Sequence, residues 1–247
     1  LQAGDRVAVM LRNCPQWVMF DQAAHSLGLV VVPLYTVDRP DSVAYIVNDS
    51  GAKVLLFETD EQWQALRTVR DKMGSVQRFV ALDKLVDDAE PRLKSADSWL
   101  PPAAQLQAVS STKPAELATI IYTSCTTGKP KGVMLSHANI LSNASHTLNT
   151  FPIYTDDLLL SFLPLSHTFE RTLGYYLTVM TGATVAYARS VALLGEDLQT
   201  IRPTVTQRVR ELLAMQGVDP KPWVSLDETY TSLYRLMAAK RDDTAFW

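Results

Sequence analysis

Residues 120–137 of this sequence are Ile-Ile-Tyr-Thr-Ser-Cys-Thr-Thr-Gly-Lys-Pro-Lys-Gly-Val-Met-Leu-Ser-His. The stretch begins in a β-branched run bounded by turn residues, which is typical of a strand at the centre of a sheet. Small hydroxylated residues and a glycine follow, and then two lysines that flank Pro130. Backbone N–H and hydroxyl groups in such a loop can converge on one anion, and lysines add charge-assisted hydrogen bonds to phosphate oxygens. The stretch therefore predicts a loop that binds phosphate.

The order of the residues distinguishes this loop from two alternatives. Ser, Thr, Gly and Lys residues clustered between strands are most often a solvated turn. A P-loop of the NTPase kind is excluded, because Pro130 follows Gly128-Lys129 where that motif has a magnesium-binding serine or threonine. The full order of residues 122–133 matches a different signature.

Residues 122–133 resemble, with one departure, the loop Tyr-Thr-Ser-Gly-Thr-Thr-Gly-Lys-Pro-Lys-Gly-Val of the adenylate-forming (AMP-binding) superfamily. That superfamily includes acyl-CoA synthetases, luciferases and the adenylation domains of peptide synthetases. The departure is Cys125, which stands where the pattern has glycine. A Cβ at such a position costs backbone strain or blocks the approach of a ligand. We expect either weaker nucleotide binding or an impaired loop; a catalytic thiol is disfavoured, because the loop contains no histidine base.

Four further segments, residues 4–9, 13–17, 28–35 and 163–171, are similar to long-chain fatty acyl-CoA synthetases. The last of them reads Leu-Pro-Leu-Ser-His-Thr-Phe-Glu-Arg, and its His-x-Phe-Glu form favours the fatty-acid branch over amino-acid activators. The resemblance is continuous from residue 1 to about residue 205.

The resemblance implies a ligase that works in two steps. A fatty acid carboxylate attacks the α-phosphate of ATP to give acyl-adenylate and pyrophosphate, and the thiol of coenzyme A then displaces AMP. The loop residues implied in ATP binding are Thr123, Ser124, Cys125, Thr126, Thr127, Gly128, Lys129 and Lys131. The resemblance also implies that the Thr123 hydroxyl contacts Mg²⁺ and that His167 is a catalytic residue near the carboxylate. The residue pattern alone leaves another interpretation of His167 open, namely a helix N-terminal residue bonded to backbone.

Strand and helix patterns alternate along residues 1–82, which predicts an α/β fold with doubly wound, mostly parallel sheets and flanking helices. We expect residues 1–205 to be part of the large N-terminal domain of an adenylate-forming enzyme. Residues 83–114 are charged and proline-bearing, and we expect a linker or a surface excursion there. Residues 206–247 are unassigned. Within them, residues 225–247 resemble the start of the same domain, although they stand at the end of this sequence. A rearranged or incomplete sequence, or a chance similarity, would explain this order.

Composition excludes several classes of function. A net charge of −3 gives no basic surface for nucleic acid. The two cysteines, Cys14 and Cys125, lack metal-site spacing, so we expect reduced thiols in the cytoplasm. The apolar run at residues 27–34 is too short to span a bilayer. We therefore expect at most peripheral contact with the inner face of the membrane, and a homodimer remains open.

The later motifs of the superfamily do not occur after residue 205, neither those for adenine and ribose nor the lid domain with its catalytic lysine. Two alternatives to a long-chain fatty acid ligase therefore stay open. One is another carboxylate activator, an aryl-CoA ligase or a peptide-synthetase adenylation domain. The other is a fragment that binds nucleotide or acyl groups without catalysis, which the missing motifs favour.

Overall fold

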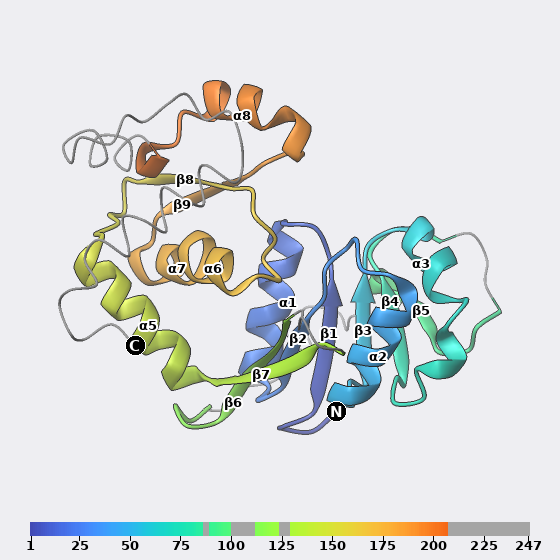
Figure 1. Cartoon of the computed structure of the whole chain (residues 1–247). Coiled ribbons are helices and arrows are strands. Elements are labelled where there is room, and N and C mark those ends of the chain that lie inside the picture. Colours follow the sequence, from blue (N-terminus) through green and yellow to red (C-terminus); the bar gives the residue numbers. More distant parts are fainter. Residues whose placement is uncertain (86–88, 100–111, 124–128, 207–247) are drawn as a thin grey trace. The chain divides into compact units, whose positions relative to one another are not determined.

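The computed structural model describes residues 1–85, 89–99, 112–123 and 129–206, which form two compact units (Figure 1). The first unit comprises Leu1–Ser142 together with Leu163–Arg171. The second comprises Asn143–Phe162 and the described residues from Thr172 onward. Apart from Thr206, the tail at residues 206–247 lies outside the described residues. The same holds for five positions of the predicted loop, namely Ser124, Cys125, Thr126, Thr127 and Gly128.

A seven-stranded sheet forms the centre of the first unit. In spatial order its strands are β5 (Leu93–Ser95), β4 (Arg78–Ala81), β3 (Val54–Phe57), β1 (Arg6–Met10), β2 (Val30–Pro33), β6 (Leu117–Thr123) and β7 (Lys131–Ser136). Neighbouring strands are parallel except β6 and β7, which form an antiparallel pair. The predicted α/β fold with a doubly wound, mostly parallel sheet is confirmed.

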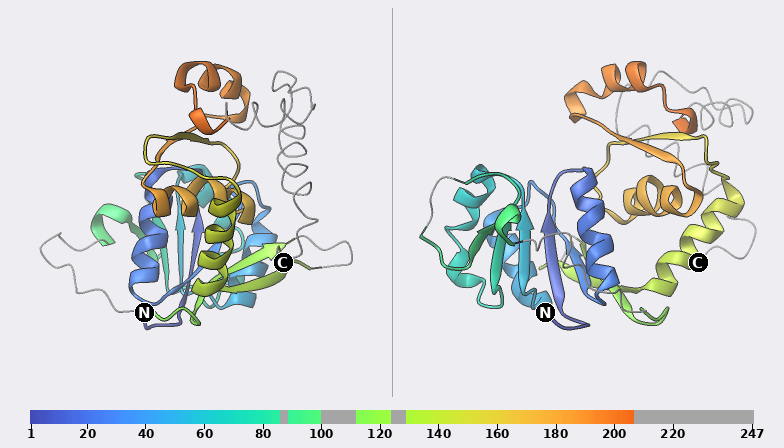
Figure 2. Two further views of the ribbon diagram at one scale, coloured as in Figure 1. Left: turned by 90° about the vertical axis from the view of Figure 1, so that its left-hand side faces the viewer. Right: turned by 180° about the vertical axis from the view of Figure 1, so that it is seen from behind.

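The helices α1 (Pro15–Ser26) and α2 (Pro40–Ser50) lie on opposite faces of this sheet. Helix α2 is in front in Figure 1, whereas α1 is in front when the molecule is seen from behind in Figure 2. The strand order explains the arrangement, because α1 leads from β1 to β2 and α2 returns past β1 to β3. Right-handed crossovers in opposite directions place their helices on opposite faces. The two faces of β6 therefore meet different helices.

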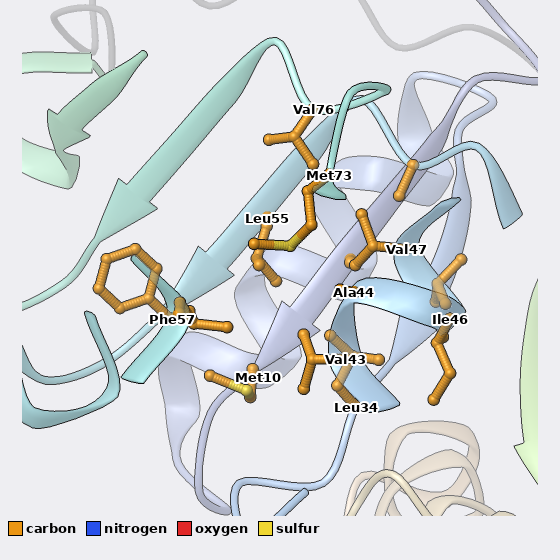
Figure 3. Close-up of a cluster of buried hydrophobic side chains, with 14 of the residues drawn as sticks. Met10, Leu34, Val43, Ala44, Ile46, Val47, Leu55, Phe57, Met73 and Val76 are labelled. Carbon is orange, nitrogen blue, oxygen red and sulfur yellow. The ribbon is translucent and has the colours of Figure 1, made fainter. Parts of the chain in front are cut away.

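The main hydrophobic core lies between the sheet and α2, with α3 (Asp60–Leu66) extending it (Figure 3). Alternate residues of the strands point into this core, as the two-residue repeat of a strand requires. From β1 and β3 these include Met10, Leu55 and Phe57, all at most 4% exposed. Helix α2 contributes the core residues Val43, Ala44, Ile46 and Val47. The helical spacing of these residues presents one apolar face to the sheet.

Two helical segments have distinctive local features. Thr59 is the N-cap residue of α3: its hydroxyl accepts a hydrogen bond from the Gln62 N–H, and the Gln62 side chain accepts one from the Thr59 N–H. This reciprocal pair is a capping box. The helical stretch before β9 consists of α6 (Thr168–Glu170), a π-helical turn over Arg171–Tyr176 and α7 (Leu177–Thr181).

Residues 83–114 contribute to the first unit where the structure describes them. Strand β5 pairs in parallel with β4, with Leu93 opposite Phe79, and α4 (Ala96–Trp99) follows it directly. Such a three-residue strand carries too little alternation to be recognised from sequence. The described part of this segment is therefore an edge strand and a short helix.

The second unit contains the parallel pair β8 (Leu158–Ser161) and β9 (Thr184–Tyr187), together with α7 and α8 (Leu194–Ile201). Its buried Asp157 accepts hydrogen bonds from the Tyr154 N–H at 2.8 Å and the Thr204 hydroxyl at 2.7 Å, which ties residues before β8 to those after α8. Helix α5 (His137–Thr150) belongs to both units, with the boundary after Ser142. Within the described ranges, no helix is both long and apolar enough to cross a membrane.

Candidate functional site

The antiparallel pair β6 and β7 brackets the predicted phosphate loop. Thr123, the last residue of β6, lies directly opposite Lys131, the first residue of β7, and both are exposed. Side chains of directly opposed residues project from the same face of an antiparallel pair. The structure thus brings Thr123 and Lys131 together at the mouth of the loop, and the exposed Lys129 lies two residues before Lys131.

Helix α2 contacts the loop where it enters β7. The Tyr45 hydroxyl donates a hydrogen bond to the Pro130 carbonyl at 3.3 Å, and the Lys129 ammonium lies 5.2 Å from the centroid of the Tyr45 ring. One turn further along α2, Asp49 accepts a hydrogen bond from the Tyr122 hydroxyl at 2.6 Å. Burial and this bond to Asp49 raise the pKa of Tyr122, so its hydroxyl stays protonated and donates. The loop is therefore anchored on both of its strands by one helix.

Gly132 allows β7 to pass close to β6. A Cβ at this position would lie 2.7 Å from Cγ2 of Ile120 and 3.1 Å from Cζ of Tyr122. Non-bonded carbon atoms are at their best separation at about 3.5–4.0 Å. The glycine in the Lys-Gly-Val part of the sequence is thus required by packing at the base of the loop.

The segment that contains His167 is attached to the same sheet by Asn13, which follows β1. The Asn13 side chain donates to the Leu163 carbonyl at 2.5 Å and accepts from the Leu165 N–H at 2.9 Å. Because β1 and β6 run in the same direction, the residues after β1 and the loop after β6 lie at the same, carboxyl edge of the sheet. Open α/β sheets bind their ligands at that edge. Both predicted parts of the site therefore belong to one edge of one sheet.

His167 begins α6 and uses its side chain to cap it. Its Nδ1 accepts a hydrogen bond from the Phe169 N–H at 3.2 Å. Partial burial lowers the pKa of His167, so the imidazole is neutral near pH 7. A neutral imidazole that accepts through Nδ1 carries its proton on Nε2. The cap interaction is the one that the residue pattern alone predicted, and it also orients the ring.

A buried ionic network lies on the face of β6 opposite α2. The guanidinium of Arg171, 1% exposed, donates to the carboxylate of Asp21 on α1, which is 0% exposed, and to the Thr119 hydroxyl of β6 at 2.7 Å. The guanidinium also lies over the Trp17 ring, 5.1 Å from its centroid. Four residues before Arg171, the His167 carbonyl accepts the Arg171 N–H at 3.1 Å. The network therefore ties the segment with His167 to α1 and β6.

Two histidines adjoin this network. His25 on α1 approaches Asp21, with Nδ1 at 3.6 Å from Oδ2, and its ring lies edge-on to the His137 ring at a centroid distance of 4.9 Å. Burial lowers the pKa of His25, and Arg171 adds to the effect, while Asp21 opposes it. Burial also lowers the pKa of His137. Both imidazoles are therefore neutral at pH 7.

We expect the folded chain to lose stability below about pH 6.5, because these histidines bind protons readily only when unfolded. Because the pKa is lower in the folded state, the unfolded chain binds more protons than the folded chain below about pH 6.5. The free energy of unfolding therefore decreases as the pH is lowered. Each such proton contributes at most about 1.4 kcal/mol per pH unit. Denaturant unfolding from about pH 7.5 to about pH 5.5 measures the decline.

His25→Gln should make this decline shallower, because it removes one of the two groups whose pKa is lowered in the folded chain. A stability that rises on acidification, or a decline equally steep in His25→Gln, would contradict the assignment.

Sequence patterns alone did not predict the residues that support the site: Asn13, Asp21, Tyr45 and Asp49. The residue type gives one signal in retrospect, since Asp21 shares the buried face of α1 with Trp17 and Ala24. Buried carboxylates are rare unless they are paired. The pairing partner lies 150 residues away, so only the fold identifies it.

The family model described as "AMP-binding enzyme" matches residues 1–238. Long chain acyl-CoA synthetase 6, peroxisomal, of Arabidopsis thaliana is 33% identical over 219 residues, which cover 85% of this chain and 31% of that protein. Long-chain-fatty-acid–CoA ligase 6 of Mus musculus is 28% identical over 225 residues, covering 84% of this chain and 32% of that protein.

This chain is also similar to the crystal structure of a long-chain-fatty-acid–CoA ligase from Archaeoglobus fulgidus, with a TM-score of 0.69 and 26% sequence identity. The match covers 83% of this chain and 39% of the ligase chain. The chain thus spans about a third of the length of the curated relatives that it matches. With the family model matching nearly the whole sequence, and with the sheet and hairpin described above, this chain belongs to the family of AMP-binding enzymes.

Proposed function

We propose that this chain takes part in the ATP-dependent activation of a long-chain fatty acid, as the part of a fatty acid–CoA ligase that binds the phosphates. The reaction forms an acyl-adenylate and pyrophosphate, and coenzyme A then accepts the acyl group with release of AMP. The observation that supports this proposal most directly is the pairing of Thr123 with Lys131 at the mouth of the predicted loop, in a chain whose relatives are long-chain acyl-CoA synthetases.

The described residues of the loop can bind the outer phosphates of ATP. Lys131, the first residue of β7, and Lys129, two residues before it, are exposed, and each carries an ammonium group. Thr123, the last residue of β6, adds a hydroxyl opposite Lys131. Charge-assisted hydrogen bonds to phosphate are among the strongest in proteins. Neutralising the triphosphate makes the α-phosphate easier for a carboxylate to attack, so positioning and electrostatics carry most of the catalysis.

The Thr123 hydroxyl is a suitable ligand for Mg²⁺, since this ion prefers oxygen atoms. Across the described ranges, no three His, Cys, Asp or Glu side chains come together to hold a metal ion. The residues therefore fit an ion that arrives with the nucleotide, because Mg²⁺ usually keeps phosphate and water oxygens among its ligands. When bound, Mg²⁺ would neutralise negative charge on the phosphates.

His167 is suited to orient the carboxylate of the fatty acid. Its neutral ring holds a proton on Nε2, which can donate a hydrogen bond to a carboxylate or to an acyl-adenylate oxygen. A neutral donor would leave the carboxylate ionised and nucleophilic. The cap to Phe169 and the attachment of the segment by Asn13 and Arg171 restrict the movement of this ring.

The second candidate function is binding of nucleotide without turnover. It requires only the binding groups of Thr123, Lys129 and Lys131, at the two strand ends that flank the loop. Activation of another carboxylic acid, such as an aryl or amino acid, is the alternative within the family. The identity of the relatives favours long-chain fatty acids over both of these substrates.

Exchange of labelled pyrophosphate into ATP tests the proposal on this chain, with magnesium and with acids of different classes. Exchange that requires a long-chain fatty acid supports adenylation. Exchange that follows an aryl or amino acid instead overturns the substrate assignment. Calorimetric binding of ATP without any exchange would support the binding-only candidate, and the absence of ATP binding would contradict both.

Lys131→Ala is expected to weaken ATP binding by at least about tenfold, since a charge-assisted hydrogen bond is worth about 1.5–3 kcal/mol. AMP binding should change by less than about twofold, because AMP lacks the outer phosphates that we assign to Lys131. Titration calorimetry with both nucleotides measures the difference. Lys94→Ala, an exposed lysine on β5 at the opposite edge of the sheet, is the matched control. Equal losses for ATP and AMP would contradict the placement of Lys131.

A further inference from the structure

Tyr45 contacts the loop entry in two ways that are independent of each other. Its hydroxyl donates to the Pro130 carbonyl at 3.3 Å, and its ring faces the Lys129 ammonium at 5.2 Å. The residue is half-buried on α2, the helix that contributes Val43, Ala44, Ile46 and Val47 to the main core. Pro130 is 85 positions away in the sequence, so this contact exists only in the folded chain. Tyr45 is thus a rigid side chain between the core and an exposed lysine.

We propose that Tyr45 is a positioning residue that sets the preference for ATP over AMP by holding Lys129 ready for the outer phosphates. This inference rests on the proposed function of the loop. An ammonium on the face of an aromatic ring uses one side for the cation–π contact and keeps N–H groups on its other side for an anion. The contact therefore restricts the lysine side chain without occupying the part that binds phosphate.

The energetic reason is preorganisation. A free lysine side chain is among those that lose the most rotamer freedom when they are fixed, and this loss opposes binding. The Tyr45 ring fixes Lys129 before the nucleotide arrives, and the bond to Pro130 fixes the backbone beside it. The same helix fixes the other strand of the loop through the bond from Tyr122 to Asp49. Removing the ring should therefore weaken binding of the outer phosphates and spare the rest of the nucleotide.

Two variants of Tyr45 separate the ring from the hydroxyl. Tyr45→Leu removes both contacts and should weaken ATP binding by about five- to tenfold while AMP binding changes by less than about twofold. Tyr45→Phe keeps the ring and should lose only about twofold in ATP affinity. In a Lys129→Ala background, Tyr45→Leu should have little further effect, because its partner is gone. Tyr154→Leu, at an exposed tyrosine in the second unit, is the control.

The outcomes separate the inference from the proposed function. Equal losses for ATP and AMP in Tyr45→Leu, or losses that add to those of Lys129→Ala, overturn the positioning role even if the chain binds ATP normally. A second measurement needs no nucleotide: NMR of the chain after reductive methylation of its lysines with labelled formaldehyde. The Lys129 signal, assigned by its absence in Lys129→Ala, should show a ring-current shift that persists in Tyr45→Phe and disappears in Tyr45→Leu. A Lys129 signal that is identical in Tyr45→Leu overturns the inference, whether or not the chain binds ATP.

Discussion

Arg171→Met is expected to lower the free energy of unfolding by about 3–5 kcal/mol, the cost of breaking a buried ion pair by removing one partner. The side chains of Arg171 and Asp21 are 1% and 0% exposed, so water cannot solvate the Asp21 carboxylate that the variant leaves without its partner. The Thr119 hydroxyl also loses the donor that lies 2.7 Å from it. Denaturant unfolding of the variant beside the unchanged chain measures the loss.

A double variant separates the missing partner from poor packing. In Asp21→Leu/Arg171→Met both charges are gone, and we expect most of the lost stability to return, because apolar replacements of buried ion pairs are often neutral or stabilising. Lys72→Met is the control, since the pair of Lys72 and Asp41 has the same charges at 2.7 Å but is 64% and 76% exposed. Exposed pairs contribute about 0–1 kcal/mol. A loss in Arg171→Met no larger than that of Lys72→Met would contradict the role of the buried pair.

Gly132→Ala is expected to destabilise the chain by about 1–3 kcal/mol through overpacking at the base of the loop. The new Cβ would lie 2.7 Å from Cγ2 of Ile120 and 3.1 Å from Cζ of Tyr122. Neither neighbour can easily move away, because β-branched side chains are stiff at χ1 and the Tyr122 hydroxyl is held by Asp49 at 2.6 Å. Strand β7 must therefore shift, and the Lys131 end of the loop shifts with it.

Gly74→Ala is the matched control, because nothing lies within 4 Å of a Cβ at that glycine. Denaturant unfolding compares the two variants, and ATP titration should show weaker binding only in Gly132→Ala. If Gly132→Ala were as stable as Gly74→Ala, the close approach of β7 to β6 would not be the reason for this glycine.

The elements and the loop could be predicted from sequence because their signals are local. Short apolar runs mark β1, β2 and β3, and Gly51 and Gly182 end their helices with φ angles of 65° and 74°, the left-handed conformation that glycine adopts most easily. The order of residues 122–133 identified the family, which the comparisons confirm. The local features that these patterns do not record are the capping box at Thr59, the three-residue strand β5 and the π-helical turn over Arg171–Tyr176.

The sequence by itself determined the alternation of strands and helices and the family, and it predicted the phosphate loop, because each is encoded by residues close together in the chain. Only the tertiary structure decided that Asp21 pairs with Arg171 and that Tyr45 contacts Pro130 and Lys129. These partners are distant in sequence, and they meet because the strand order places β2 beside β6 and puts α1 and α2 on opposite faces. Strand order depends on the packing of the whole unit, which no short pattern of residues records.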